Sequence, residues 1–148
     1  MTKHKKSIIT SLVLLIIVTV VIFWVNNRSN PQQPFSDLSV SDIYSISVYA
    51  IPPDKAIMVN DVEQTEAIVQ ILRTVVVYEK SNAWKKSSGQ GVYFTVNKTS
   101  GEVVVVRPYG LHLIIDGQGY KTEYQPSENL NRIANTLLDT PFGGRPIE

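Results

Sequence analysis

The chain has 148 residues and a formal net charge of +1, but its charges and its apolar residues are unevenly distributed. Residues 1–28 contain four Lys and Arg and no acid, whereas residues 29–148 contain ten Lys and Arg against thirteen Asp and Glu. The absence of Cys excludes disulfides, thiol catalysis and Cys-ligated zinc or iron–sulfur sites, and the net acidic body argues against general nucleic-acid binding.

The first predicted element is a transmembrane helix over Ile8–Val25, in which fifteen of eighteen residues are apolar and none is charged. A helix of that length spans about 27 Å, close to the apolar thickness of a bilayer. Lys3, Lys5 and Lys6 precede it, which predicts a cytoplasmic amino terminus (residues 1–7) and an extracytoplasmic remainder. A cleaved signal peptide is the alternative, but its apolar region is typically about 7–15 residues long and ends in small residues. We therefore expect an uncleaved signal-anchor and a single-pass protein of the cell membrane.

The rest of the chain divides into three parts. Residues 26–39 are polar, contain Pro31 and Pro34, and predict an extended linker. Residues 40–139 predict one folded domain, and residues 140–148 a flexible tail. Alternating or β-branched apolar residues predict strands at Asp42–Ile51, Ala56–Val59, Val75–Tyr78, Val92–Asn97, Glu102–Arg107, Leu111–Asp116 and Tyr120–Tyr124.

Two helices are expected among these strands. Asn60 and Glu63 have the spacing of a capping box and open a helix with an apolar stripe that ends near Val75. A second helix starts near Pro126. The resulting order of elements favours an α+β fold, a mainly antiparallel sheet with two helices packed on one face. The continuous apolar run Val103–Val106 predicts a central strand with both faces covered.

Residue chemistry gives little support for catalysis. His112 could act as a general base oriented by Asp116, but four residues along a strand separate the two by about 13 Å. An exposed strand histidine is the simpler interpretation. Glu63 and Glu66, the closest acidic pair on a helix, are explained by a favourable helix amino terminus. We therefore assign no catalytic, metal-binding or cofactor-binding residue and expect no cofactor.

The most suggestive segment lies between two predicted strands, where Trp84 is surrounded by Lys80, Lys85 and Lys86. An aromatic residue among cations indicates a possible partner-binding surface for a protein or an anionic envelope polymer. In the alternative interpretation, Trp84 folds back onto the core and the lysines keep the loop soluble. The segment from Arg107 to Gly110 is a second loop of similar type, for which a turn is the simpler interpretation.

Three features of the chain together resemble one group of small proteins. They are the Lys-flanked anchor, the capped helix Asn60–Val75, and the sequence Asp116-Gly117-Gln118-Gly119-Tyr120-Lys121 before a terminal helix. These proteins are the small membrane-anchored or lipid-anchored ectodomains of unknown function common in Gram-positive bacteria; this chain lacks the lipobox cysteine of the lipid-anchored ones. The resemblance implies a location and a fold but no activity. We predict a non-catalytic extracytoplasmic binding domain, held in the membrane by Ile8–Val25, with a protein or envelope-polymer partner and no nucleic-acid partner. The alternatives are an immunity or inhibitor protein acting at the membrane and an extracytoplasmic hydrolase.

Overall fold

The computed structural model describes residues 13–22, 30–139 and 145–146. The chain forms two compact units, residues 1–30 and Pro31–Glu148. Within the first unit, the described residues 13–22 are helical, and their apolar side chains are exposed. The second unit contains the sheet and the helices that surround the candidate site.

The structure does not support the membrane-spanning helix predicted over residues 8–25. Residues 8–12 and 23–25 lie outside the described residues, and among the described helices none is long and apolar enough to cross a membrane. The prediction relied on apolar composition, which does not by itself fix where a helix begins and ends. This finding overturns the transmembrane component of the predicted fold, the signal-anchor assignment and the localisation as a single-pass membrane protein.

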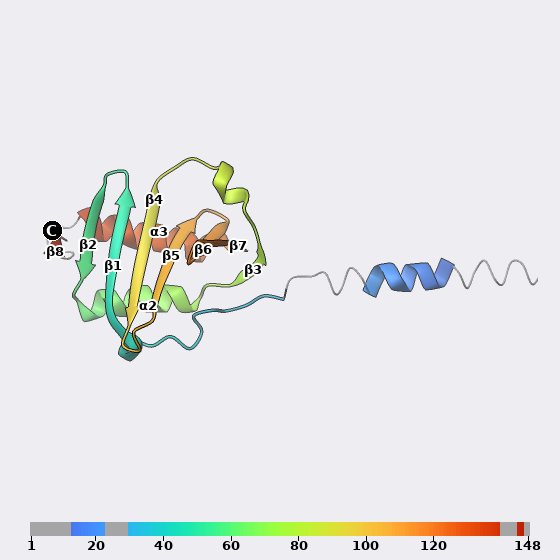
Figure 1. The fold of residues 1–148 in the computed structure, drawn as a ribbon, viewed down its shortest axis with the longest axis horizontal. Coiled ribbons are helices and arrows are strands. Elements are labelled where there is room, and N and C mark those ends of the chain that lie inside the picture. The colour runs from blue at the N-terminus through green and yellow to red at the C-terminus, as the bar shows by residue number, and fades with distance from the viewer. Residues whose placement is uncertain (1–12, 23–29, 140–144, 147–148) are drawn as a thin grey trace, which may run out of the picture. The chain divides into compact units, whose positions relative to one another are not determined.

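The second unit is α+β and is built on one antiparallel sheet of eight strands (Figure 1). The strand order is β3-β7-β6-β5-β4-β1-β2-β8. The strands are β1 (Ile43–Ile51), β2 (Lys55–Val59), β3 (Val77–Lys80), β4 (Gly91–Lys98), β5 (Val103–Tyr109), β6 (His112–Ile115), β7 (Gln118–Thr122) and β8 (Arg145–Pro146). Strands adjacent in sequence are mostly paired, because short turns join them into hairpins.

Two helices, α2 (Val62–Arg73) and α3 (Tyr124–Asp139), cover one face of this sheet (Figure 1). Each carries an apolar stripe at helical spacing, and both stripes join a single core with the inward-facing strand residues. The core residues contributed by the helices are Ile68, Val69, Leu72, Leu130, Ala134, Leu137 and Leu138. The opposite face carries no α-helix among the residues that the structure describes, and we refer to it as the helix-free face.

Residue alternation along each strand separates the two faces. In β1, Ile46, Val48 and Ala50 are fully buried toward the helices, whereas Tyr49 points to the helix-free face and is half-buried. The prediction that Val103–Val106 is covered on both faces is wrong, because Val103 is 51% exposed. An apolar run does not itself show how many layers cover a strand, and here helices cover only one face.

Local signals set the ends of several elements. The amino-terminal cap of α2 is Asp61, one residue later than predicted, because its carboxylate accepts a 2.9 Å hydrogen bond from the backbone N–H of Gln64. At the β6–β7 turn, Asp116 and Gly117 both have positive φ, 50° and 83°. These angles suit the type I′ turn that two-residue hairpin loops favour.

The second half of the predicted linker belongs to the folded unit, which begins at Pro31. Gln32 exchanges two backbone hydrogen bonds of 2.8 Å with Val77 and so pairs with the edge strand β3. Phe35 and Leu38 are buried in the core. These two apolar residues stand alone among polar ones, so they have no periodicity by which the sequence could identify them. At the other edge, β8, from the predicted tail, pairs with β2.

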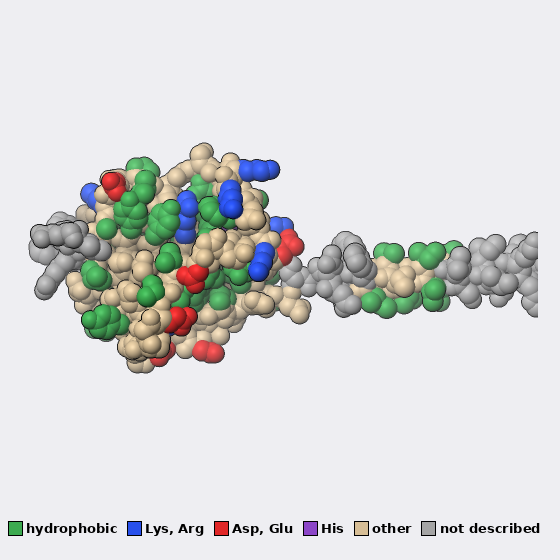
Figure 2. Space-filling view, viewed as in Figure 1, with side chains coloured by type: hydrophobic (Ala, Val, Ile, Leu, Met, Phe, Trp, Pro, Cys, Tyr) green, Lys and Arg blue, Asp and Glu red, His purple; other side chains and the backbone are tan. Residues whose placement is uncertain are grey.

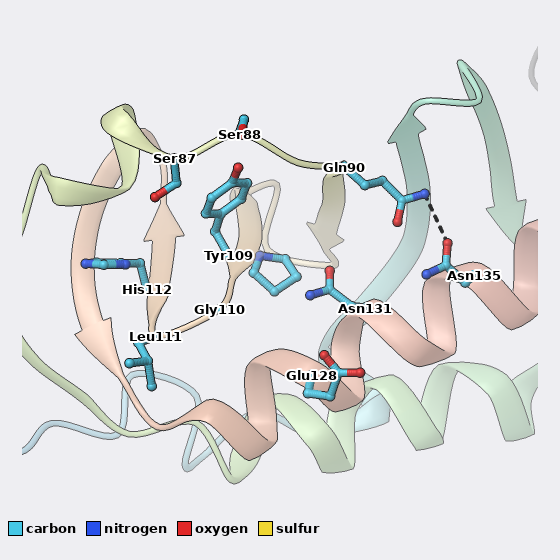
Figure 3. A pocket seen from close by; sticks show the side chains of 11 residues that line it. Ser87, Ser88, Gln90, Tyr109, Gly110, Leu111, His112, Glu128, Asn131 and Asn135 are labelled. Atoms are coloured by element: carbon cyan, nitrogen blue, oxygen red, sulfur yellow. Dashed lines mark hydrogen bonds between the residues drawn. The ribbon is translucent and has the colours of Figure 1, made fainter.

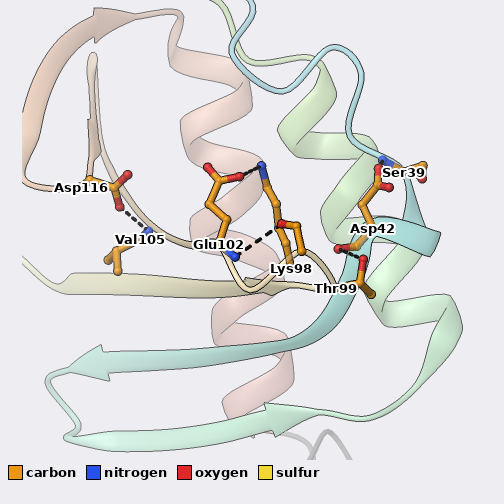
Figure 4. A network of polar contacts seen from close by, with 8 residues as sticks. Ser39, Asp42, Lys98, Thr99, Glu102, Val105 and Asp116 are labelled. Carbon is orange, nitrogen blue, oxygen red and sulfur yellow. Dashed lines mark hydrogen bonds and ion pairs between the residues drawn. The ribbon is translucent and has the colours of Figure 1, made fainter.

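A polar network fixes the end of the sheet where β1 begins (Figure 4). The Asp42 carboxylate accepts hydrogen bonds of 2.9 Å from the backbone N–H and the hydroxyl of Ser39. These bonds, with a smaller contribution from the charge of Lys98, hold the pKa of Asp42 below its ordinary value. The carbonyl of Asp42 accepts from the N–H of Thr99, and Lys98 forms a 2.8 Å ion pair with Glu102.

Candidate functional site

Trp84 lies in the short 3-10 helix η2 (Ala83–Lys86), between β3 and β4, and is half-buried. Its indole lies so close to β7 that a Cβ atom placed on Gly119 would overlap the Nε1 and Cδ1 atoms of Trp84. The Nε1 group is buried and has no hydrogen-bond partner among the described residues. Glycine at position 119 therefore leaves the space in which Trp84 is held against the sheet.

The three lysines of the predicted partner-binding segment are exposed. Lys80 ends β3, and Lys85 and Lys86 form the last turn of η2. Of the three, Lys85 is placed against Trp84, with its Nζ 5.7 Å from the centre of the indole. On the face of the body seen in Figure 2, most Lys and Arg side chains gather at the upper right, near the segment that contains η2.

Arg107, on the helix-free face of β5, is the centre of an aromatic cluster that the sequence did not reveal. Its Cζ atom lies 4.9 Å from the centre of the Tyr93 ring, and 5.3 Å from those of both Trp84 and Tyr109. The Nε group is buried without a hydrogen-bond partner, and Arg107 forms no ion pair with any described residue. We refer to Arg107, Trp84, Tyr93 and Tyr109 as the arginine cluster.

Strand register explains how the cluster forms. Tyr49 is paired with Tyr93 across β1 and β4, and Arg107 is paired with Ile114 across β5 and β6. Ile114 in turn is paired with Gly119, over which Trp84 lies. Residues in register on neighbouring strands point to the same face, so these side chains form one row across the sheet. A cavity of about 340 Å³ opens beside this row, lined by Trp84, Tyr93, Val105, Arg107, Ile114, Asp116 and Gly117.

The row ends at Tyr49, whose ring centre is 5.9 Å from that of Tyr93. The Tyr49 hydroxyl donates a 2.8 Å hydrogen bond to the Asp54 carboxylate, and this bond raises the pKa of Tyr49 above its ordinary value. The phenol is therefore neutral at physiological pH. It contributes a polar rim and no charge to the surface around Arg107.

A second cavity, of about 610 Å³, lies between the segment that follows η2, the β5–β6 turn and α3 (Figure 3). We refer to it as the polar pocket because six of its eleven lining residues carry an amide or a hydroxyl group. The lining residues are Ser87, Ser88, Gln90, Pro108, Tyr109, Gly110, Leu111, His112, Glu128, Asn131 and Asn135. Tyr109 belongs to both sites, since its ring contacts Arg107 and it also lines the polar pocket.

The residues considered for catalysis are not brought together. His112 lines the polar pocket, whereas Asp116 lines the cavity of the arginine cluster and accepts a 2.8 Å hydrogen bond from the backbone of Val105. Glu63 and Glu66 are exposed on α2, where Glu66 contacts Gln70. Among the described residues, no group of three or more His, Asp or Glu is placed to hold a metal ion. The hydrolase alternative remains a prediction.

The sequence indicated Trp84 and its lysines but missed Arg107 and the polar pocket. The sequence predicts a strand that ends at Arg107 and a turn from Arg107 to Gly110, whereas β5 continues to Tyr109. Asn131 and Asn135 have the spacing of an ordinary solvent-facing helix stripe, so no local signal separates them from surface residues. Comparison of the chain with protein-family models, curated proteins and solved structures found no match. The resemblance to membrane-anchored ectodomains accordingly remains a prediction.

Proposed function

We propose that the folded body is a non-catalytic binding domain that holds an acidic segment of a partner protein on its helix-free face. The observation that carries this proposal is Arg107, a cation surrounded by three aromatic rings that forms no ion pair within the described part of the chain. An inhibitor or immunity role is the alternative, in which the acidic segment belongs to the protein that is inhibited.

Ring contacts prepare Arg107 for a carboxylate. A contact with an aromatic ring is electrostatic and involves no hydrogen bond to a lone pair, and Arg107 donates no hydrogen bond to another described residue, so its N–H donors are not used up within the described part of the chain. The surrounding rings also restrict the side chain, which lowers the entropy lost on binding. Arg and aromatic residues are the side chains most often found at the energetic centre of interfaces.

The charges around the cluster favour an acidic partner. Residues 80–93 contain three Lys and no Asp or Glu. Lys85 and Lys86 are exposed at the edge of the cluster, in positions that would attract an acidic segment before contact. Asp116 lines the same cavity and contributes one negative charge to it. Its Oδ1 accepts a backbone hydrogen bond from Val105, so that oxygen has a partner within the body.

The test is fluorescence anisotropy with a labelled peptide of alternating Glu and Gly, compared with a peptide of alternating Gln and Gly. We expect the full-length protein to bind the acidic peptide, and Arg107→Gln to weaken binding about thirtyfold, as expected for a central arginine. The double variant Lys85→Gln/Lys86→Gln should weaken it less and reduce its salt dependence, because both lysines are exposed. Arg73→Gln, which removes an exposed cation on α2, is the matched control and should bind as the wild type does.

Equal affinity for the Gln peptide, or unchanged affinity in a folded Arg107→Gln variant, would overturn the proposal. Thermal unfolding monitored by circular dichroism shows whether each variant is folded. Polygalacturonate provides a further comparison, because it carries carboxylates on a sugar polymer. If it binds and the acidic peptide does not, the partner is an anionic polymer and the proposed protein partner is wrong.

A further inference from the structure

We propose that the polar pocket is a second and separate binding site, and that its ligand is a neutral, hydroxyl-rich molecule of the saccharide class. The pocket has a volume of about 610 Å³, within the range of about 300–1,000 Å³ common for small-molecule sites. It does not depend on the acidic partner proposed above, because most of its lining lies outside the arginine cluster.

Three segments distant in sequence build the pocket (Figure 3). Glu128, Asn131 and Asn135 occupy positions i, i+3 and i+7 of α3, so they lie along one side of that helix, and all three are half-buried. The β5–β6 turn and the segment after η2 supply the other walls.

Existing hydrogen bonds hold two walls of the pocket in place. The Gln90 amide donates to the backbone carbonyl of Pro52 at 2.8 Å and to the Asn135 side chain at 3.1 Å (Figure 3). This contact ties the segment after η2 to α3. On another wall, the guanidinium of Arg107 contacts the Tyr109 ring. A pocket that is largely formed before binding loses less entropy when it takes a ligand.

The lining matches the chemistry of sugar hydroxyls. A hydroxyl group both donates and accepts hydrogen bonds, and the amides of Asn131 and Asn135 and the hydroxyls of Ser87 and Tyr109 do the same. Both N–H groups of the Gln90 amide are already engaged, so Gln90 offers its carbonyl oxygen as an acceptor. Asn131 forms no hydrogen bond with another described residue, so its amide is open to a ligand. The side chains of Pro108, Tyr109 and Leu111 provide apolar surface of the kind that the C–H groups of a sugar ring contact.

The charge of the lining disfavours an anionic ligand. Among the described residues that line the pocket, Glu128 carries the one carboxylate, and none is Lys or Arg. A phosphate or carboxylate would lose its hydration without gaining a cation in exchange. Glu128 instead supplies two strong acceptors for hydroxyl donors. A neutral polyol or sugar therefore fits the pocket better than a phosphorylated or acidic ligand.

The experiment is an NMR titration of the full-length, ¹⁵N-labelled protein with methyl glucoside, N-acetylglucosamine, maltose and adenosine as separate probes. We expect at least one of the three sugars to shift the side-chain amide signals of Gln90, Asn131 and Asn135 in a saturable way. Asn131→Leu should weaken that binding about tenfold, because it removes one donor and one acceptor from the site. Gln70→Leu, which removes an exposed amide on α2, is the matched control and should leave the affinity unchanged.

Three results would each overturn the proposal. The first is that no sugar produces a saturable shift, and the second is that the shifts persist unchanged in Asn131→Leu. The third is that adenosine binds more strongly than the sugars. Measuring both ligands on the same proteins separates this proposal from the function proposed above. If sugars bind the wild type and Asn131→Leu weakens that binding while the acidic peptide does not bind, the saccharide site holds and the acidic-partner site fails.

Discussion

At the scale of single residues, Asp42 links the segment that leads into β1 to the β4–β5 turn, at one end of the sheet. Its carboxylate is bonded to Ser39, its backbone carbonyl is bonded to Thr99, and it lies near the charge of Lys98. Because the hydrogen bonds from Ser39 lower its pKa, the folded state favours the ionised form. Its contribution to stability is fully present above the ordinary pKa of 3.8 and is lost as the pH falls through the lowered pKa of the folded state.

We therefore predict that Asp42→Asn lowers the free energy of unfolding at neutral pH and that the difference from wild type shrinks below about pH 4. Urea unfolding at a series of pH values measures this. Asp37→Asn is the control, since Asp37 is exposed and its carboxylate has one contact, to the neighbouring Ser36. A difference between wild type and Asp42→Asn that is constant with pH would show that the charge of Asp42 does not contribute to the effect.

The contacts of Trp84 and Arg107 could not be predicted from the sequence. Trp84 is conspicuous in the sequence because it stands among lysines, but its burial depends on Gly119, which is thirty-five positions away. Arg107 gains its importance from three rings on separate segments. Contacts of this kind depend on strand register and pairing order, which a single sequence does not determine.

At the scale of elements, the sequence predicted the type and order of the α-helices and strands from Val40 to Asp139, because their periodicities are strong. The ends of elements were less accurate, since a cap depends on one side chain. Asn60 and Asp61 are both acceptable cap residues, and the sequence does not choose between them. The structure identifies Asp61, through its bond to the backbone of Gln64.

The two candidates for the cap provide a matched pair of variants. Asp61→Ala removes the acceptor for the backbone N–H of Gln64, and the cost expected for a lost cap is about 1 kcal/mol. Asn60→Ala should change the free energy of unfolding by less than about 0.5 kcal/mol, because Asn60 is exposed and lies outside the helix. Urea unfolding of both variants measures the difference. Equal losses, or a larger loss for Asn60→Ala, would contradict the assignment of Asp61 as the cap.

At the scale of the whole body, the two faces of the sheet carry different groups of side chains. Both helices pack on one face and build the core, so the other face is free to carry the arginine cluster. The polar pocket forms beside α3, where the β5–β6 turn and the segment after η2 approach the helix. Neither site could be predicted from the sequence, because each combines segments that the order of elements alone does not place together.

The boundary of the body is a property of the whole domain and can be tested by shortening the chain. A chain that begins at residue 31 should unfold as cooperatively as the full chain, because it retains every residue of the second unit. A chain that begins at residue 40 loses Phe35 and Leu38, which are 6% and 8% exposed, and the pairing of Gln32 with Val77. Burial of two such side chains contributes about 3–6 kcal/mol, a large part of the stability of an ordinary domain.

Urea unfolding of the two shortened chains measures this loss, and the double variant Phe35→Ala/Leu38→Ala in the full chain is the control. If the double variant loses about as much stability as the chain that begins at residue 40, the side chains account for the effect. A larger loss in the shortened chain would measure the added contribution of Gln32, which covers the edge of β3, and of Ser39, which donates two hydrogen bonds to the Asp42 carboxylate. Equal stability of the two shortened chains would instead show that residues 31–39 are a linker, and that the domain begins near Val40 as the sequence predicted.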